Sequence, residues 1–280
     1  MIPAAFDYER PESLDQALRL LAEHGDDAKV LAGGHSLLPA MKLRLAQPGV
    51  VIDIGRIDAL RSIRKQGRRI GVGSLATHYE IESSKLLGDK CPLLPEVAAQ
   101  IGDVQIRNRG TIGGSLVHAD PAADWPAAIL ALDAEMEIAG REGVRTVAAQ
   151  DFFVDMLETA VKPNEILVSI TVPVTRKGVA YAKFAQKASG FAIAGAAVWI
   201  EGRRVAVGIT GVAARAYRAA GVEAALGGRR SLKAAAIEEA SRHVADNVEP
   251  LGDIHASAEF RAHLARVYTV RALEMAISRK

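Results

Sequence analysis

The order of helix and strand patterns changes once along this chain, and that change constrains its fold more than any other feature. Up to about residue 174 the two patterns alternate. Beyond that point, three consecutive strands are predicted at 179–186, 192–201 and 203–213, followed by helices at about 216–226, 231–245 and 257–278. Strands followed by helices are typical of an α+β domain with an antiparallel sheet. We therefore expect one domain over residues 1–174 and a second, with a three-stranded antiparallel sheet packed on helices, over residues 178–280.

The first part of the chain, to about residue 56, has the pattern of a small α/β lobe. Ser13 precedes a run with apolar residues at helical spacing and Gly25 follows that run, so a capped helix is predicted between them. Strands are predicted at 29–32 and 50–54, separated by a short helical segment that ends before Pro48.

A second lobe is expected over residues 57–174. Strands are predicted at 68–74, 134–140, 144–148 and 165–173, and the second and third of these pair across a turn. Thr77 and Glu80 form a capping box, which opens a helix. Further helices are predicted at 92–102 and, after a glycine pair at 113–114, up to about Leu132. A short helix is predicted to start in the stretch 151–156.

An earlier glycine pair, Gly33-Gly34, stands between a predicted strand and a predicted helix. Glycine permits positive φ and a close approach of other atoms. The unpaired amides and the dipole at a helix start favour an anion. The pair therefore fits a phosphate cradle of backbone N–H groups and an ordinary tight turn equally well. Its surroundings match neither the P-loop nor the Rossmann pattern.

The second pair, Gly113-Gly114, is flanked by the hydroxyl side chains of Thr111 and Ser115. Two glycines and two hydroxyls in five residues form a donor-rich surface that a ligand can approach closely. Two such loops in one domain could hold both phosphates of a dinucleotide. Farther along, Asp120 followed by proline predicts a capped helix start, and the Asp124 carboxylate favours the helix dipole.

A third glycine-rich stretch, GVGSLA at 71–76, matches the Rossmann pattern G-x-G-x-x-A. A Rossmann unit also needs an acidic residue about 20 positions later, at the end of a second parallel strand. That region, KCPLLPEV at 90–97, contains two prolines and no strand pattern. We therefore reject the Rossmann interpretation.

The charge, the cysteine content and the absence of certain motifs argue against several other classes of protein. The chain has 35 basic and 33 acidic residues, which argues against nucleic-acid binding. Cys91 is the only cysteine, so the chain cannot supply ligands for an iron–sulfur cluster of its own. No histidine pair has metal-ligand spacing and no nucleophile–base arrangement is present, so we expect no metal and no catalytic side chain. No signal peptide or transmembrane segment is expected either.

Two stretches of the sequence, taken together, are specific enough to indicate a protein family. AGGHSLLPAMKLRLA at 32–46 and TIGGSLVHADPAADWPA at 111–127 resemble the FAD-binding medium subunit of the molybdenum hydroxylases, which include xanthine dehydrogenase and aerobic carbon monoxide dehydrogenase. The resemblance extends over nearly the whole chain. It implies a two-lobed FAD-binding domain of the vanillyl-alcohol-oxidase (PCMH) type, with lobes of about 1–56 and 57–174. A C-terminal domain like that of carbon monoxide dehydrogenase flavoproteins would follow.

The same resemblance implies a set of cofactor-binding residues. Backbone amides of both glycine motifs would contact the FAD pyrophosphate, which explains why the side chains there are small. Asp124 matches an acidic FAD ligand, Ile101 packs on the cofactor, Leu167 lines the adenine side and Lys183 approaches the flavin. The complete set is Ala32, Gly33, Gly34, His35, Ser36, Leu37, Leu38, Ile101, Thr111, Ile112, Gly113, Gly114, Ser115, Asp120, Asp124, Leu167 and Lys183.

The function implied by the resemblance is electron transfer within a complex. A large subunit would hold molybdopterin and oxidise the substrate, and a small subunit would hold two 2Fe–2S clusters, in a dimer of heterotrimers. FAD on this chain would pass electrons to a quinone or to NAD⁺. A cytoplasmic protein is expected, with the inner face of the membrane as a further possibility. The alternatives are a stand-alone flavin oxidoreductase and a flavin-free nucleotide-binding or scaffold protein.

Overall fold

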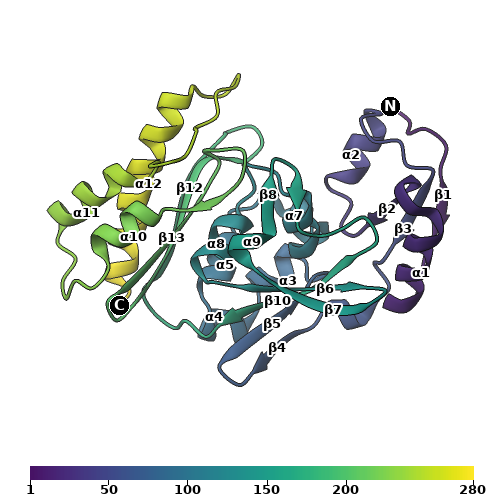
Figure 1. The fold of residues 1–280 in the computed structure, drawn as a ribbon, viewed down its shortest axis with the longest axis horizontal. Helices are drawn as coiled ribbons and strands as arrows, with labels where there is room; N and C mark the ends of the chain where they lie inside the picture. Colours follow the sequence, from purple (N-terminus) through teal and green to yellow (C-terminus); the bar gives the residue numbers. More distant parts are fainter.

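A computed structural model describes all 280 residues of the chain. Figure 1 shows a small N-terminal lobe on the right, a second lobe in the centre and the C-terminal part on the left. The N-terminal lobe contains a parallel sheet in the order β1-β3-β2. Its strands and helices are β1 (Asp7–Glu9), α1 (Leu14–His24), the 3-10 turn η1 (Gly25–Asp27), β2 (Ala28–Leu31), α2 (Leu37–Lys42) and β3 (Val50–Asp53).

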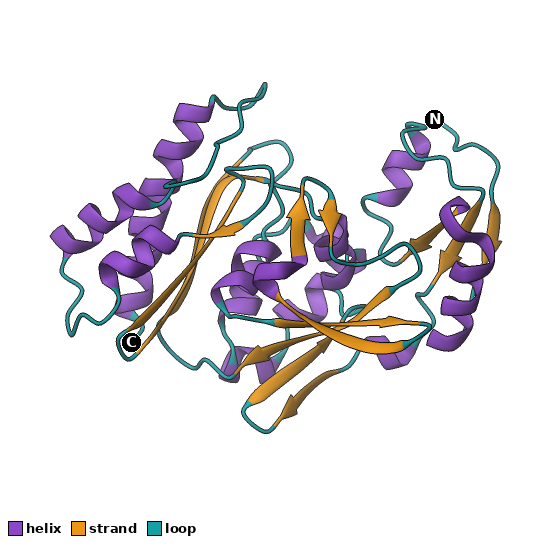
Figure 2. Ribbon diagram, in the orientation of Figure 1, coloured by secondary structure: helices purple, strands orange, loops and turns teal.

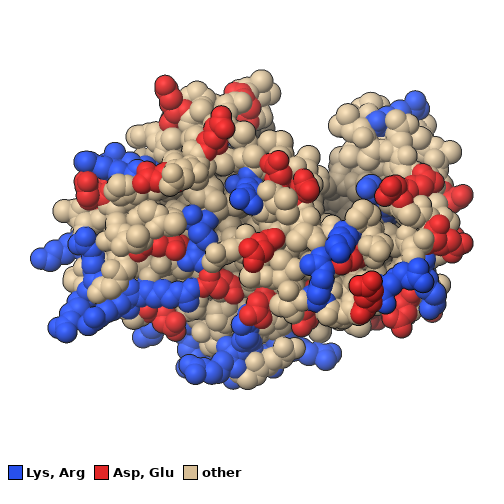
Figure 3. Space-filling model, in the orientation of Figure 1, with Lys and Arg blue, Asp and Glu red and all other residues tan.

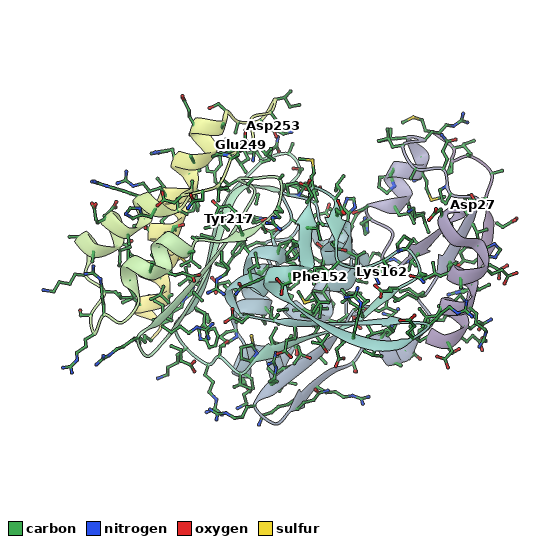
Figure 4. The ribbon with its side chains drawn as sticks, in the orientation of Figure 1. Asp27, Phe152, Lys162, Tyr217, Glu249 and Asp253 are labelled. Carbon is green, nitrogen blue, oxygen red and sulfur yellow. The ribbon has the colours of Figure 1, made fainter.

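Local signals in this lobe act as the sequence predicts. The Ser13 side chain caps α1 by accepting from the Gln16 amide, and Gly25 ends the helix with a φ of 54°. Asp27, labelled in Figure 4, accepts a hydrogen bond from the Gly49 amide and so fixes the entry to β3. The helix α2 is shorter than predicted because Arg44 adopts a φ of 58° and turns the chain.

The second lobe is built on an antiparallel sheet in the order β4-β5-β10-β6-β7. The strands are β4 (Ile63–Gln66), β5 (Arg69–Gly73), β6 (Glu135–Gly140), β7 (Gly143–Ala148) and β10 (Ile166–Pro173), and the turn η2 (Asp58–Leu60) precedes them. The stretch 71–76 lies at the end of β5, which is antiparallel to both of its neighbours. A Rossmann unit needs parallel strands, so its rejection is confirmed.

Helices cover one side of this sheet, as Figure 2 shows. They are α3 (His78–Glu82), α4 (Lys85–Lys90), α5 (Leu93–Ala98), α6 (Val104–Arg109), α7 (Ile112–His118), α8 (Trp125–Ala131) and α9 (Ala149–Phe152). A two-stranded ribbon, β8 (Phe153–Asp155) and β9 (Glu158–Thr159), follows α9. The capping box predicted for α3 is present, with reciprocal bonds between Thr77 and Glu80.

Two local predictions in this lobe are wrong. The helix expected after the second glycine pair, up to about Leu132, begins only at Trp125 of α8; the glycine pair itself lies in a separate helix, α7, which ends where Ala119 takes a left-handed φ of 49°. Asp120 does not cap a helix there; its carboxylate accepts from the Ala122 amide and forms a turn between the two helices. The helix expected to begin at 151 already ends at Phe152, where the chain continues into β8.

The C-terminal part is the predicted antiparallel sheet covered by helices. Its order is β11-β12-β13-β14, with a two-residue hairpin loop between β12 and β13. The fourth strand was not predicted because it is only two residues long. The elements are β11 (Val179–Ala185), β12 (Ala192–Glu201), β13 (Arg204–Thr210), β14 (Tyr217–Arg218), α10 (Ala220–Leu226), α11 (Ala234–Ala240), η3 (Ser241–His243) and α12 (Ala258–Ser278).

This sheet is buried on both faces. One face packs on α10, α11 and α12 through a cluster that includes Val198, Val207 and Leu273. The other face continues the core of the second lobe, where Trp199 and Ala206 join the same cluster as Trp125 of α8. The central strand β12 is therefore apolar along its length instead of alternating. None of the helices combines the length and the apolar composition that a membrane crossing requires.

Candidate functional site

A cavity of about 550 Å³ lies where the N-terminal lobe meets the second lobe, and both glycine motifs line it. In Figure 3 a hollow separates the N-terminal lobe from the rest of the molecule, and acidic and basic side chains both occur near it. The volume falls within the range of roughly 300–1,000 Å³ that is usual for cofactor sites. The cavity thus has the size and the place expected of a site between two lobes.

The first motif presents unused backbone donors to this cavity. None of the amides of residues 32–36 donates a hydrogen bond within the chain, and no side chain caps α2. Gly34 adopts a φ of 80°, which turns the backbone as only glycine does easily. At Gly33 a Cβ would stand 2.3 Å from the carbonyl oxygen of Arg109, so the loop also needs glycine to pack against that segment. A run of unpaired donors at a helix start is suited to an anion.

The second motif is built differently, because its glycines lie in the first turn of α7. The amides from Ile112 to Ser115 are all bonded inside the chain, and Thr111 Oγ1 accepts from the Gly114 amide at 3.1 Å. A Cβ on Gly113 would stand 2.7 Å from the carbonyl oxygen of Ser74, so this glycine permits close packing of α7. The second motif therefore contributes small residues and hydroxyl groups to the cavity. The free backbone amides come from the first motif.

Gly114 faces more open space. A Cβ there would meet Thr111 Oγ1 at 2.9 Å and the Ala32 Cβ at 3.8 Å. The two motifs are thus neighbours across the cavity, as the dinucleotide hypothesis requires. Most of the predicted site residues line the same cavity: Ala32, Gly33, Gly34, His35, Ser36, Leu37, Ile101, Thr111, Gly113, Gly114, Ser115, Asp120 and Leu167.

Four predicted residues do not line it: Leu38, Ile112, Asp124 and Lys183. Asp124 and Lys183 are joined to each other instead, with the ammonium 2.9 and 3.0 Å from the two carboxylate oxygens. Each side chain is only 5% exposed. The Tyr181 hydroxyl also donates to Asp124. Although Asp124 stands at the N-cap position of α8, its side chain makes no capping bond.

The Lys183 ammonium also connects two segments of the cavity wall. It donates to the carbonyl oxygens of Gln100 and Gly190, each at 2.7 Å. Their sequence neighbours Ile101 and Phe191 line the cavity. Burial raises the pKa of Asp124, and the Lys183 ammonium opposes that rise by favouring the carboxylate. The pair therefore supports the wall of the cavity from behind.

Sequence reasoning missed several lining residues whose positions depend on long-range packing. They include Lys29, Ser74, His78, Glu165 and Phe191. His78 lay within the capping-box pattern, where only the cap was recognised. Glu165 lies beside Arg145, which donates to both of its carboxylate oxygens and lowers the pKa of that carboxyl. His35 and His118, which the sequence placed near the glycine motifs, both line the cavity.

The donors of the cavity fit a dinucleotide such as FAD. The free amides of residues 32–36 can hold a phosphate, and the mostly apolar remainder can cover ring systems. Ser74 adds a buried hydroxyl oxygen that has no hydrogen-bond partner within the chain. Such a group usually has a partner in the complete protein. These observations agree with a bound phosphate-containing cofactor.

Known families match both parts of the chain. Residues 4–175 match the FAD binding domain in molybdopterin dehydrogenase. Residues 179–276 match the CO dehydrogenase flavoprotein C-terminal domain.

Individual relatives match over their full length. The carbon monoxide dehydrogenase medium chain of Hydrogenophaga pseudoflava is 40% identical over 100% of this chain and 99% of its own. The 6-hydroxypseudooxynicotine dehydrogenase complex subunit alpha of Paenarthrobacter nicotinovorans is 36% identical over 100% of this chain and 97% of its own length. A solved structure of the Hydrogenophaga pseudoflava carbon monoxide dehydrogenase, lacking the Mo-pyranopterin moiety, superposes with a TM-score of 0.95 at 41% identity, covering 99% of both chains.

Proposed function

The chain belongs to the family of FAD-binding subunits of the molybdenum hydroxylases, and on this premise we propose that it passes electrons from a partner's iron–sulfur clusters to an acceptor such as a quinone or NAD⁺. It is an oxidoreductase subunit, and its cofactor is FAD. The observation that carries the proposal is the run of unpaired amides at residues 32–36 inside a cavity between two lobes.

In this proposal the protein binds and orients the cofactor and contributes no catalytic side chain. The amides of residues 32–36 hold the pyrophosphate, and Gly114 keeps the opposite side of the cavity open. Ile101 and Leu167 supply apolar contacts. When bound, FAD supplies the capacity to accept and release electrons. Asp124 and Lys183 act on the cofactor indirectly, by fixing the segments that carry Ile101 and Phe191.

The proposed partners are a large subunit with molybdopterin and a small subunit with two 2Fe–2S clusters, assembled as a dimer of heterotrimers on the cytoplasmic side. The names of the relatives, a medium chain and a complex subunit, support an assembly of this kind. Cys91 cannot ligate a cluster alone, so electrons must arrive from clusters on another chain. We also propose that residues 1–174 form the FAD-binding domain and residues 178–280 the second domain.

The substrate is proposed to be selected on another subunit. The two relatives named above have comparable identity to this chain, yet their names refer to carbon monoxide and to 6-hydroxypseudooxynicotine. Two substrates so different in size and chemistry would not share one pocket of this type. The similarity of the flavin subunits therefore supports a role that is common to both complexes.

The test is the visible absorbance spectrum of the complex purified with its partner subunits, with the released flavin identified after denaturation. We expect one FAD for each copy of this chain. An intact complex without flavin, even after soaking with FAD, would favour the scaffold alternative. A monomeric chain that oxidises a substrate with oxygen would favour the stand-alone oxidoreductase.

A further inference from the structure

A buried histidine of the cavity wall is not used by the electron-transfer role described so far. His78 is the first residue of α3, its side chain lines the cavity, and the residue is only 4% exposed. Its amide donates to the carbonyl oxygen of Gly110 at 2.9 Å, which fixes the start of the helix beside α6. The backbone therefore holds the imidazole at one place in the wall.

The indole of Trp125 determines which imidazole nitrogen carries the hydrogen. Trp125 Nε1 lies 3.1 Å from His78 Nδ1. An indole nitrogen can only donate, so Nδ1 must accept and the hydrogen of a neutral ring must be on Nε2. Adding a second proton would bring two N–H groups against each other. Trp125 is completely buried in the core and has no freedom to turn away.

The surroundings also disfavour the charged ring. Burial, together with the smaller effects of His35 and Arg107, lowers the pKa of His78 to about 4. The Arg107 guanidinium is itself held by Glu82 and by the carbonyl oxygens of Ile101 and Gly102. The two side chains that act on the ring, His35 and Arg107, are both basic, and the nearby Glu82 carboxylate is paired with Arg107. No free carboxylate therefore favours a protonated His78 ring.

The second nitrogen of the ring lies against Gly110, in the segment that packs on the first glycine motif. A Cβ on Gly110 would stand 2.7 Å from His78 Nε2, so only glycine leaves room for the ring. Gly110 in turn adjoins the motif, because a Cβ on Gly33 would stand 2.8 Å from the Gly110 Cα. The bond from Trp125 is the only hydrogen bond of the imidazole within the chain. A fixed N–H donor is therefore left in the wall of the cavity that the unpaired amides of residues 32–36 also line.

We propose that His78, held as a neutral imidazole by Trp125, donates its Nε2 hydrogen to a pyrophosphate oxygen of bound FAD. This inference rests on the proposed function, because it requires FAD in the cavity. His78 extends the backbone cradle by one side-chain donor that does not change charge near neutral pH. It binds the cofactor and takes no part in proton transfer.

The test compares FAD binding to the full chain carrying His78→Phe or His78→Gln. Phenylalanine keeps an aromatic ring but has no donor, whereas the amide of glutamine can accept from Trp125 and still donate. We expect His78→Phe to weaken FAD binding roughly 10- to 100-fold, the loss of a hydrogen bond to a charged group, and His78→Gln to retain most of the affinity. Equal affinities of His78→Phe and wild type would overturn the inference. Failure of the wild type to bind FAD would overturn the proposed function instead.

Two further measurements locate the bond and the proton. ADP carries the pyrophosphate without the flavin, so His78→Phe should weaken ADP binding by a similar factor; unchanged ADP affinity would contradict the pyrophosphate contact. Nitrogen-15 NMR of histidine-labelled wild type with FAD should show His78 neutral, with its hydrogen on Nε2, between about pH 5.5 and 8. An imidazolium signal, or a hydrogen on Nδ1, would overturn the proposal without any variant.

Discussion

Removal of the Lys183 ammonium tests how the cavity wall is supported. In Lys183→Met the Asp124 carboxylate stays in a site that is 5% exposed and keeps only the Tyr181 hydroxyl as a side-chain partner. The carbonyl oxygens of Gln100 and Gly190 lose their donor as well. Breaking a buried pair by removing one partner costs about 3–5 kcal/mol. At about 2–4 °C for each kcal/mol in a chain of this size, we expect the melting temperature to fall by roughly 10 °C.

The assays are thermal and urea unfolding of the full chain without cofactor, each followed by circular dichroism, together with an FAD titration of each variant. Asp124→Asn and the double variant Asp124→Asn/Lys183→Met complete a double-mutant cycle. The double variant should lose less stability than the sum of the single changes, because it leaves no unpaired buried charge, whereas each single variant does.

The same variants distinguish support of the cavity from direct contact with the cofactor. If the pair positions Ile101 and Phe191, stability and FAD affinity should fall together in both single variants. If Asp124 binds FAD directly, Asp124→Asn should lose affinity and keep its stability. A loss below about 1 kcal/mol in Lys183→Met would refute the structural argument, since it would place the interaction in the range of exposed pairs.

Three other predictions concern single residues. Gly114→Val should abolish FAD binding in a chain that remains folded by circular dichroism, because the added side chain enters the space beside Ala32; a normal flavin content would contradict this. Cys91 should resist alkylation at neutral pH until the chain unfolds, because burial raises the pKa of its thiol to about 11; rapid labelling of the native chain would show that the thiol is accessible. The cofactor-free chain should lose about 3 kcal/mol of stability as the pH falls from about 6.5 through 4, because the unfolded chain protonates His78 first; an identical pH dependence in His78→Gln would argue against this linkage.

The sequence was sufficient for the features that depend on neighbours along the chain. Ser13 and Thr77 cap the helices that their patterns predict, since a capping bond spans only three residues. The three long strands of the C-terminal sheet lie close to their predicted limits, and a two-residue hairpin loop joins the second to the third. The sequence also marked both glycine motifs as parts of one binding site, and both line the same cavity. A backbone that approaches a ligand closely needs small residues, and these are visible in the sequence.

The roles of individual residues within those motifs came only from the tertiary structure. Both glycine pairs look alike in sequence, but the amides of residues 32–36 are unpaired while Thr111 and the Ser74 carbonyl occupy those of the second motif. The Gly113 amide is taken by a carbonyl oxygen from a distant segment, and no local pattern records that bond. The Gly114 amide is taken by the nearby Thr111 hydroxyl.

Asp124 shows the same division most clearly. Its position before a helix predicted a favourable interaction with the helix terminus, and the family resemblance implied a cofactor ligand. The folded chain brings Lys183 to within 2.9 Å of it across 59 positions of sequence. A buried carboxylate without a charged partner is costly, so its environment is decided by what packs against it. The sequence by itself thus determined the family and the cofactor, and it marked the two glycine motifs. The tertiary structure decided which groups line the cavity and which support its wall from behind, because desolvation and charge pairing exist only once distant segments have packed together.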